Sequence, residues 1–261
     1  MQIFNRTDSN FPGRRDRRAE TGAPPRGTLG FARSSQRCQN PGEMPNPTRT
    51  ADVAKLAFRF VLIIGIVNFF ADFTYEGARS IAGPFLGSLG ASAAIVGFVA
   101  GGGELAGYGL RSVSGYFADK TRRYWAAAFL GYAINMLAVP ALALAGNWPV
   151  AAALIVAERT GRAIRKPSVE AMLSHAGKSI GHGWVFGWNE TLDQAGATLG
   201  PLVVAFVLYR RGSYPRAFAA LLISALLCLA VLAAACLLHR RPQELEYGAV
   251  RTFHPQAFRK A

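Results

Sequence analysis

Long apolar runs, separated by short polar segments, fill the chain between residues 55 and 238. A helix rises about 1.5 Å per residue, so roughly 20 apolar residues cross a hydrocarbon core of about 30 Å. The runs predict six membrane-spanning helices, at about residues 56–75, 91–111, 124–146, from 148 onward, 185–209 and 217–238. A soluble domain has no use for so many segments of this length. The sequence therefore predicts an all-α membrane protein.

The fourth predicted span has the weakest apolar pattern, because Glu158, Arg159 and Arg162 lie within it. Charged side chains inside a bilayer are costly unless they face the interior of a helix bundle. This segment crosses the membrane only if neighbouring helices shield its charges. We predict that it does cross, because the charge pattern of the later loops would otherwise be inverted.

Small residues are frequent within the predicted spans. Gly101, Gly102 and Gly103 are consecutive, and Gly196 and Gly200 are four residues apart. In lipid, helices associate through close backbone approach, which small residues permit. The sequence thus predicts a bundle in which helix packs directly on helix.

Charged residues make up only 17% of the chain, and they concentrate outside the apolar runs. Residues 1–50 contain nine arginines, four acidic residues and six prolines, a composition that cannot bury a core. We predict that residues 1–50 form a disordered basic cytoplasmic tail. The six-helix transmembrane bundle then occupies residues 51–240, and residues 241–261 form a second cytoplasmic tail.

The net charge of +14 follows the pattern of a membrane topology and not that of a nucleic-acid-binding surface. Lysine and arginine gather on the cytoplasmic side of membrane helices. One side would carry Arg49, Lys55, Arg59, Arg111, Lys120, Arg122, Arg123, Arg159, Arg162, Arg165, Lys166, Lys178, Arg240 and Arg241, and the other Arg79, Arg210, Arg211 and Arg216. We predict a multi-pass protein of the cell (inner) membrane with both termini in the cytoplasm.

Ionisable residues inside membrane spans are candidates for function because their burial is costly. The candidates for transport or coupling are Asp72, Glu76, Arg79, Glu104, Asn135, Glu190 and Asp193. The acids among them could line an aqueous path, bind a cation, or exchange a proton. The structural alternative is an ion pair, between Glu76 and Arg79 or between Glu104 and a basic residue of the fourth span.

The sequence predicts neither a cofactor nor a metal site. Cys38, Cys228 and Cys236 show no disulfide or metal-ligand spacing. Gly177, Lys178 and Ser179 resemble the end of a phosphate-binding loop, but Met172 stands where its first glycine belongs. Without a nucleophile–base or metal constellation, a membrane enzyme is the least favoured class.

The segment after the second span has a small residue, an acid four positions on, and a basic run: Gly115, Asp119, Lys120, Arg122 and Arg123. It resembles the loop between the second and third helices of the major facilitator superfamily. In that family the loop is a conformational latch, whose acid pairs with nearby helix ends. The resemblance implies this role for Asp119, although Thr121 and Arg122 stand where the family has a glycine.

A second resemblance lies in the fifth span, where Gly187, Gly196, Gly200 and Pro201 follow the spacing of a signature found in many exporters and antiporters of the superfamily. Valine and alanine replace the two glycines that should follow the proline. A Gly-Pro pair favours helix bending and close packing, so these residues are predicted to serve one or both roles.

The resemblance covers about residues 50–245 and implies half of a twelve-helix transporter, built as two inverted three-helix repeats. Residues 241–261 would then begin the central cytoplasmic loop. The implied function is transport of a small solute across the lipid bilayer by a secondary permease completed by a second six-helix half or a second copy. No nucleic-acid partner is expected. The alternative is a non-transporting membrane subunit or an inactive truncated product.

Overall fold

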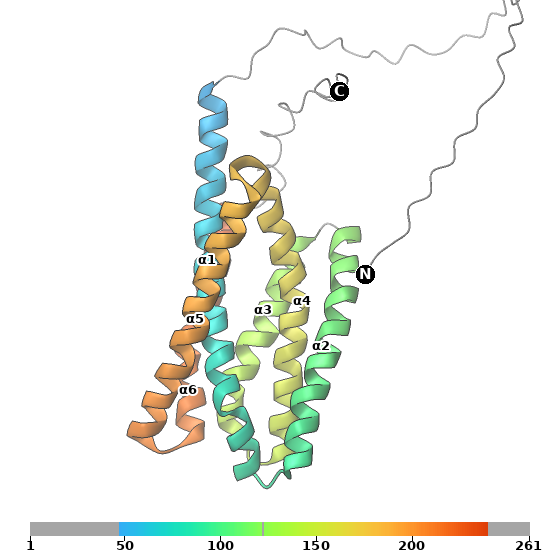
Figure 1. Ribbon diagram of the computed structural model, residues 1–261, viewed down its shortest axis with the longest axis vertical. Coiled ribbons are helices and arrows are strands. Elements are labelled where there is room, and N and C mark those ends of the chain that lie inside the picture. The colour runs from blue at the N-terminus through green and yellow to red at the C-terminus, as the bar shows by residue number, and fades with distance from the viewer. Residues whose placement is uncertain (1–46, 122, 240–261) are drawn as a thin grey trace, which may run out of the picture. The chain divides into compact units, whose positions relative to one another are not determined.

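The computed structural model describes residues 47–121 and 123–239, and these residues form helices joined by short connections. Figure 1 shows α1 (Pro47–Ser88), α2 (Ala93–Thr121), α3 (Tyr124–Ala141), the 3₁₀ turn η1 (Leu142–Leu144), α4 (Trp148–Ile180), α5 (His182–Arg211) and α6 (Tyr214–Leu238). This part of the chain contains no strand, which confirms the all-α prediction. The tails at 1–46 and 240–261, and Arg122, lie outside the described residues.

The helices end where the local sequence opposes helix continuation. Gly90, Gly181 and Gly212 have positive φ angles of 88°, 96° and 58°, a region that glycine enters without steric penalty. Asn147 caps α4, since its side chain accepts a hydrogen bond of 3.0 Å from the Val150 amide. The connections between helices are therefore encoded locally.

Five of the described helices are long and apolar enough to cross a membrane. They cover Val53–Ser88, Ala93–Thr121, Tyr124–Leu144, His182–Arg210 and Tyr214–Leu238. The remaining helix, α4, carries charges at its centre, but Glu158 and Arg165 are buried against neighbouring helices. This is the shielding that a membrane crossing by α4 requires.

Several helices are longer than the sequence predicted. Gly115, Asp119 and Lys120 lie in the last two turns of α2 and not in a loop. Arg159 and Arg162 lie within α4, as predicted, and so do Arg165 and Lys166, which the charge count had assigned to one membrane surface. A charge that ends an apolar run does not end a helix when it finds a partner on another helix, as Arg111 does with Glu170 and Lys166 does with Asp193. The charges in the middle of α4 therefore give no information about which side of the membrane is cytoplasmic.

The helix pairing has the regularity of an internal repeat. Helix α1 packs mainly on α5 and α6, and α4 packs mainly on α3 and α2. Helices α3 and α6 contact each other across the bundle. If α1, α2 and α3 are exchanged for α4, α5 and α6 in that order, the same main helix contacts result. The arrangement agrees with two three-helix repeats forming one six-helix unit.

Glycines permit close backbone approach at two helix contacts, between α3 and α4 and between α1 and α5. A Cβ atom on Gly131 of α3 would lie 2.5 Å from the Arg165 amide nitrogen, and one on Gly161 of α4 would lie 2.5 Å from that of Asn135. On α5, Cβ atoms at Gly196 and Gly200 would collide with backbone carbonyls of α1. Any larger residue would separate these helices.

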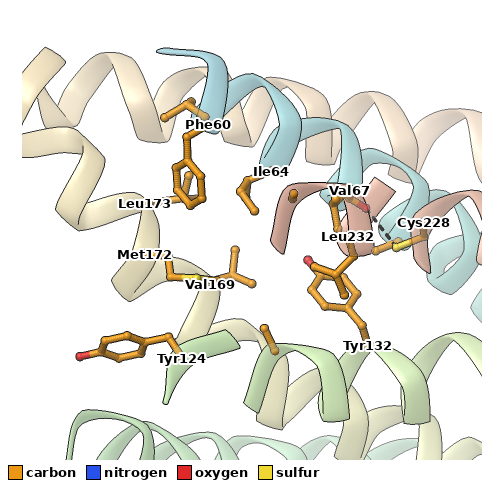
Figure 2. Close-up of a cluster of buried hydrophobic side chains, with 14 of the residues drawn as sticks. Phe60, Ile64, Val67, Tyr124, Tyr132, Val169, Met172, Leu173, Cys228 and Leu232 are labelled. Atoms are coloured by element: carbon orange, nitrogen blue, oxygen red, sulfur yellow. Dashed lines mark hydrogen bonds between the residues drawn. The ribbon is translucent and has the colours of Figure 1, made fainter. Parts of the chain in front are cut away.

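Two clusters of buried apolar side chains lie at different levels of the bundle. Figure 2 shows one of them, where Phe60 and Ile64 of α1 lie near Leu173 of α4. The other includes Phe85 of α1 and Phe218 of α6, whose ring centroids are 4.9 Å apart. Between the two clusters lie the buried polar residues Asp72 and Thr74 of α1, Glu158, Arg165 and Ser168 of α4, and Ser224 of α6. The bundle thus has a polar layer between two apolar ones.

Gly196 and Gly187 make a matched pair for testing the α1–α5 contact. We expect Gly196→Ala to lower stability by about 1–3 kcal/mol, because the added methyl group meets backbone atoms that cannot move aside. Gly187→Ala should be neutral or slightly stabilising, since no atom lies within 4 Å of its Cβ position. Thermal unfolding of both variants in detergent measures the difference, and equal effects would contradict this packing.

Candidate functional site

Arg165 lies at the centre of the polar layer and is only 3% exposed. Its Nη2 atom is 3.0 Å from Oδ1 of Asp72 on α1. Its guanidinium carbon also lies 4.7 Å from the ring centroid of Tyr132 on α3. Three helices are therefore joined through one cation, which is paired with a carboxylate and an aromatic face.

Asn68, one turn before Asp72 on α1, extends this network to α5. Its Oδ1 atom accepts a hydrogen bond of 2.5 Å from the Tyr132 hydroxyl and lies 3.5 Å from Nη1 of Arg165. Its Nδ2 atom donates to Oδ1 of Asn189 at 2.7 Å. Asn68, Tyr132 and Asn189 were not among the predicted residues, because neutral polar residues carry a weak signal in the sequence. The four-residue spacing of Asn68 and Asp72 was the signal that could have found Asn68.

A second, looser ion pair lies beside the first. Nζ of Lys166 is 3.9 Å from Oδ2 of Asp193 on α5. The other oxygen of Asp193, Oδ1, is buried and has no hydrogen-bond partner among the described residues. Acids from α1 and α5 thus flank the consecutive cations Arg165 and Lys166 of α4. The Asp193 carboxylate has free capacity to bind a cation, a proton or a solute hydroxyl.

A cavity of about 270 Å³ opens between α1, α4 and α5 at these pairs. Asp72, Asp193 and Glu190 all line it, together with Lys166. Glu190 is exposed and accepts a hydrogen bond of 2.7 Å from Gln194 of its own helix. The structure therefore brings three of the predicted residues to one polar cavity, where charges of both signs are available to a solute.

Glu76, Arg79 and Glu104 form a separate cluster with Arg159. Arg79 lies 3.5 Å from Glu76 and 3.6 Å from Glu104, and Nη1 of Arg159 is 3.1 Å from Glu104. These are the ion pairs of the structural alternative. The Arg79 side chain is 49% exposed at the surface of the six-helix bundle.

Asn135 lies apart from both clusters, deep in the contact between α3 and α4. Its Nδ2 atom donates to Oε1 of Glu158 at 2.6 Å and to the Glu158 carbonyl at 3.0 Å. The structure thus gives Asn135 a clear packing partner, which the sequence analysis did not identify. Glu158 is a buried acid that Asn135 stabilises by hydrogen bonding.

The residues predicted to form the latch gather at the end of the bundle where α2 and α3 are joined. Oδ1 of Asp119 lies 3.4 Å from the Tyr124 hydroxyl, at the start of α3. A Cβ atom on Gly115 would lie 3.5 Å from Pro167 of α4. Arg123 immediately precedes α3, whereas Arg122 lies outside the described residues. Asp119 thus lies close to a helix start.

Comparison with known proteins gives concordant matches. The family model of the Major Facilitator Superfamily matches residues 62–259. Uncharacterised proteins of Mycobacterium tuberculosis and Mycobacterium bovis are 50% identical over 157 residues, which cover 60% of this chain and 38% of each relative. A protein of Methanocaldococcus jannaschii described as an uncharacterised MFS-type transporter is 31% identical over 156 residues, or 59% of this chain and 39% of that protein. The matched segment thus spans less than two fifths of each of these relatives.

The buried Asp72–Arg165 pair predicts a strong interaction between two substitutions. Asp72→Leu should lower stability by about 3–5 kcal/mol, because it leaves the Arg165 charge buried without its partner. The double variant Asp72→Leu, Arg165→Met should recover part of this loss, since no charge then remains unpaired. Unfolding of both single variants and the double variant in detergent measures the coupling. Simple additivity of the losses would contradict the pairing.

Proposed function

Because this chain belongs to the Major Facilitator Superfamily, we propose that it forms the amino-terminal six-helix half of a secondary transporter for a small solute. The observation that carries the proposal is the buried, charged cavity between α1, α4 and α5. Buried ionisable groups within membrane helices mark solute and ion pathways. The matched segment spans about 38% of the mycobacterial relatives, so a second half completes the cavity in this proposal.

The two ion pairs of the cavity have different roles in this proposal. The Asp72–Arg165 pair, at 3.0 Å, holds α1 against α4 and remains in place during transport. The Lys166–Asp193 pair, at 3.9 Å, is loose and leaves one carboxylate oxygen unsatisfied. A solute or coupling ion that binds here competes for Asp193 and shifts the balance between conformations. Asp193 is therefore the proposed coupling residue.

The latch at Asp119 has a place in the same mechanism. Alternating access requires the two halves to move against each other around the solute site. Asp119 and Lys120 lie at the end of α2, and Asp119 contacts Tyr124 at the start of α3. We infer that Asp119 stabilises one of the two conformations.

Asp72→Asn and Asp193→Asn should slow solute uptake about tenfold or more while leaving membrane insertion intact, because each removes a charge but keeps a hydrogen-bonding side chain. Thr191→Val is the matched control on α5, since its exposed hydroxyl bonds only to the Gly187 carbonyl among described residues. Mass spectrometry of solutes taken up by vesicles measures the effect, with the chain produced together with the part of the Mycobacterium tuberculosis relative that lies outside the matched 38%.

Unchanged uptake kinetics in both variants would remove the proposed coupling role. Complete absence of uptake with the unchanged chain and with every variant would favour the alternative, a non-transporting membrane subunit or an inactive truncated product.

Cysteine labelling tests the proposed orientation and the crossing by α4. Ser92→Cys, Gly146→Cys and Ser213→Cys place thiols at the three connections on the proposed outer side, whereas Arg123→Cys and Gly183→Cys place them on the cytoplasmic side. A membrane-impermeant maleimide should label the first three in intact cells and the other two only after permeabilisation. Labelling of residues 146 and 213 from opposite sides would show that α4 does not cross.

A further inference from the structure

A second cavity, of about 100 Å³, lies between α1, α2 and α4. Its charged lining consists of Arg111, Arg159, Arg162 and Lys166 with a single acid, Glu104. The hydroxyl-bearing side chains of Tyr75 and Tyr108 complete the polar surface. This space is several times what one water molecule needs, roughly 10–15 Å³. It differs from the larger cavity in its excess of cations.

Most of these cations already have a carboxylate partner. Nη2 of Arg111 is 2.6 Å from Glu170. Arg159 is 3.1 Å from Glu104, which also lies 3.6 Å from Arg79. Glu104 is therefore shared between two guanidinium groups. These pairs hold the cavity walls in place.

Arg162 is the exception. No carboxylate of a described residue lies within 4.0 Å of its guanidinium group, whose carbon stacks 3.9 Å from the ring centroid of Tyr75. Glu158, one turn earlier on α4, faces α3 and bonds to Asn135. Arg162 therefore lines the cavity with no carboxylate of a described residue at ion-pairing distance. A guanidinium carries five N–H donors in a planar fork that fits an oxyanion.

We propose that this cavity binds the oxyanion group, a carboxylate or phosphate, of a small organic anion. Arg162 is the principal ligand, Arg159 and Lys166 supply further positive potential, and the Tyr75 ring holds the Arg162 plane in position. Neutral and cationic solutes are disfavoured, because cations outnumber the one acid of the lining. The identification of this anion as the transported solute rests on the function proposed above, but its binding does not.

Binding is tested with the purified 261-residue chain in phosphatidylcholine nanodiscs. The probes are succinate and inorganic phosphate, with glycerol and methylammonium as neutral and cationic controls. Each is used up to about 10 mM, ten times the upper end of common KM values of roughly 1 mM. At least one anion should raise the unfolding temperature in a saturable manner, and the controls should not. No response to either anion, or an equal response to the controls, overturns the proposal.

Variants locate the site. Arg162→Gln should weaken anion binding about tenfold or more, because a charge-assisted contact is lost. Arg210→Gln removes an exposed arginine of α5 outside the cavity and should leave binding unchanged. Glu104→Gln removes the one acid of the lining and should strengthen binding, a gain that misfolding cannot imitate. Unchanged affinity in both cavity variants overturns the assignment.

Two further comparisons separate the possible outcomes. Nanodiscs that contain phosphatidylglycerol test a lipid source, because a headgroup in the cavity would suppress the response to soluble anions. If the anion binds but the completed protein takes up no solute, the anion site stands and the transport proposal is rejected. If the completed protein takes up a neutral or cationic solute, and Arg162→Gln leaves that uptake unchanged, the transport proposal stands and the anion is not the transported solute.

Discussion

The ion pair between Asp72 and Arg165 is the constraint on which the bundle depends. A buried guanidinium in a membrane helix is strongly unfavourable unless a charge and hydrogen-bond acceptors surround it. Here Asp72 supplies the charge, Asn68 an acceptor and Tyr132 an aromatic face. Because these groups come from α1 and α3, the least apolar helix, α4, can occupy the centre of the bundle.

Glycine contacts make this pairing geometrically possible. Gly131 and Gly161 bring the backbones of α3 and α4 together at the level of Asn135 and Arg165. Gly196 and Gly200 bring α5 onto α1 close to Asp72. Apolar clusters on both sides of the polar layer then fix it in place. Small residues thus set the distances between the helices, and these distances allow the charged residues to pair.

The two cavities lie on either side of the seam between α1 and α4, and Lys166 lines both. One contains acids and bases, including the incompletely satisfied Asp193, and suits a group that exchanges partners. The other is dominated by cations and contains Arg162, which has an aromatic partner but no carboxylate of a described residue within 4.0 Å. A solute and its coupling site can thus lie close together, with Lys166 common to both cavities. This division of charge follows from which face of α4 each side chain occupies.

The sequence by itself determined the number and type of the elements, because the length of an apolar run reflects the thickness of a bilayer. It also indicated the family, through spacings around Asp119 and Gly200. It identified Asp72 and Asp193 as candidate functional residues, because a charge inside a membrane span is costly in free energy. Only the tertiary structure decided the partners. Asp72 and Arg165 are 93 residues apart, so no local pattern predicts their contact. Gly187 and Gly196 look alike in the sequence, but only Gly196 faces another backbone. Helix ends were misplaced for the same reason: whether a charge ends a helix depends on a partner supplied by a different helix.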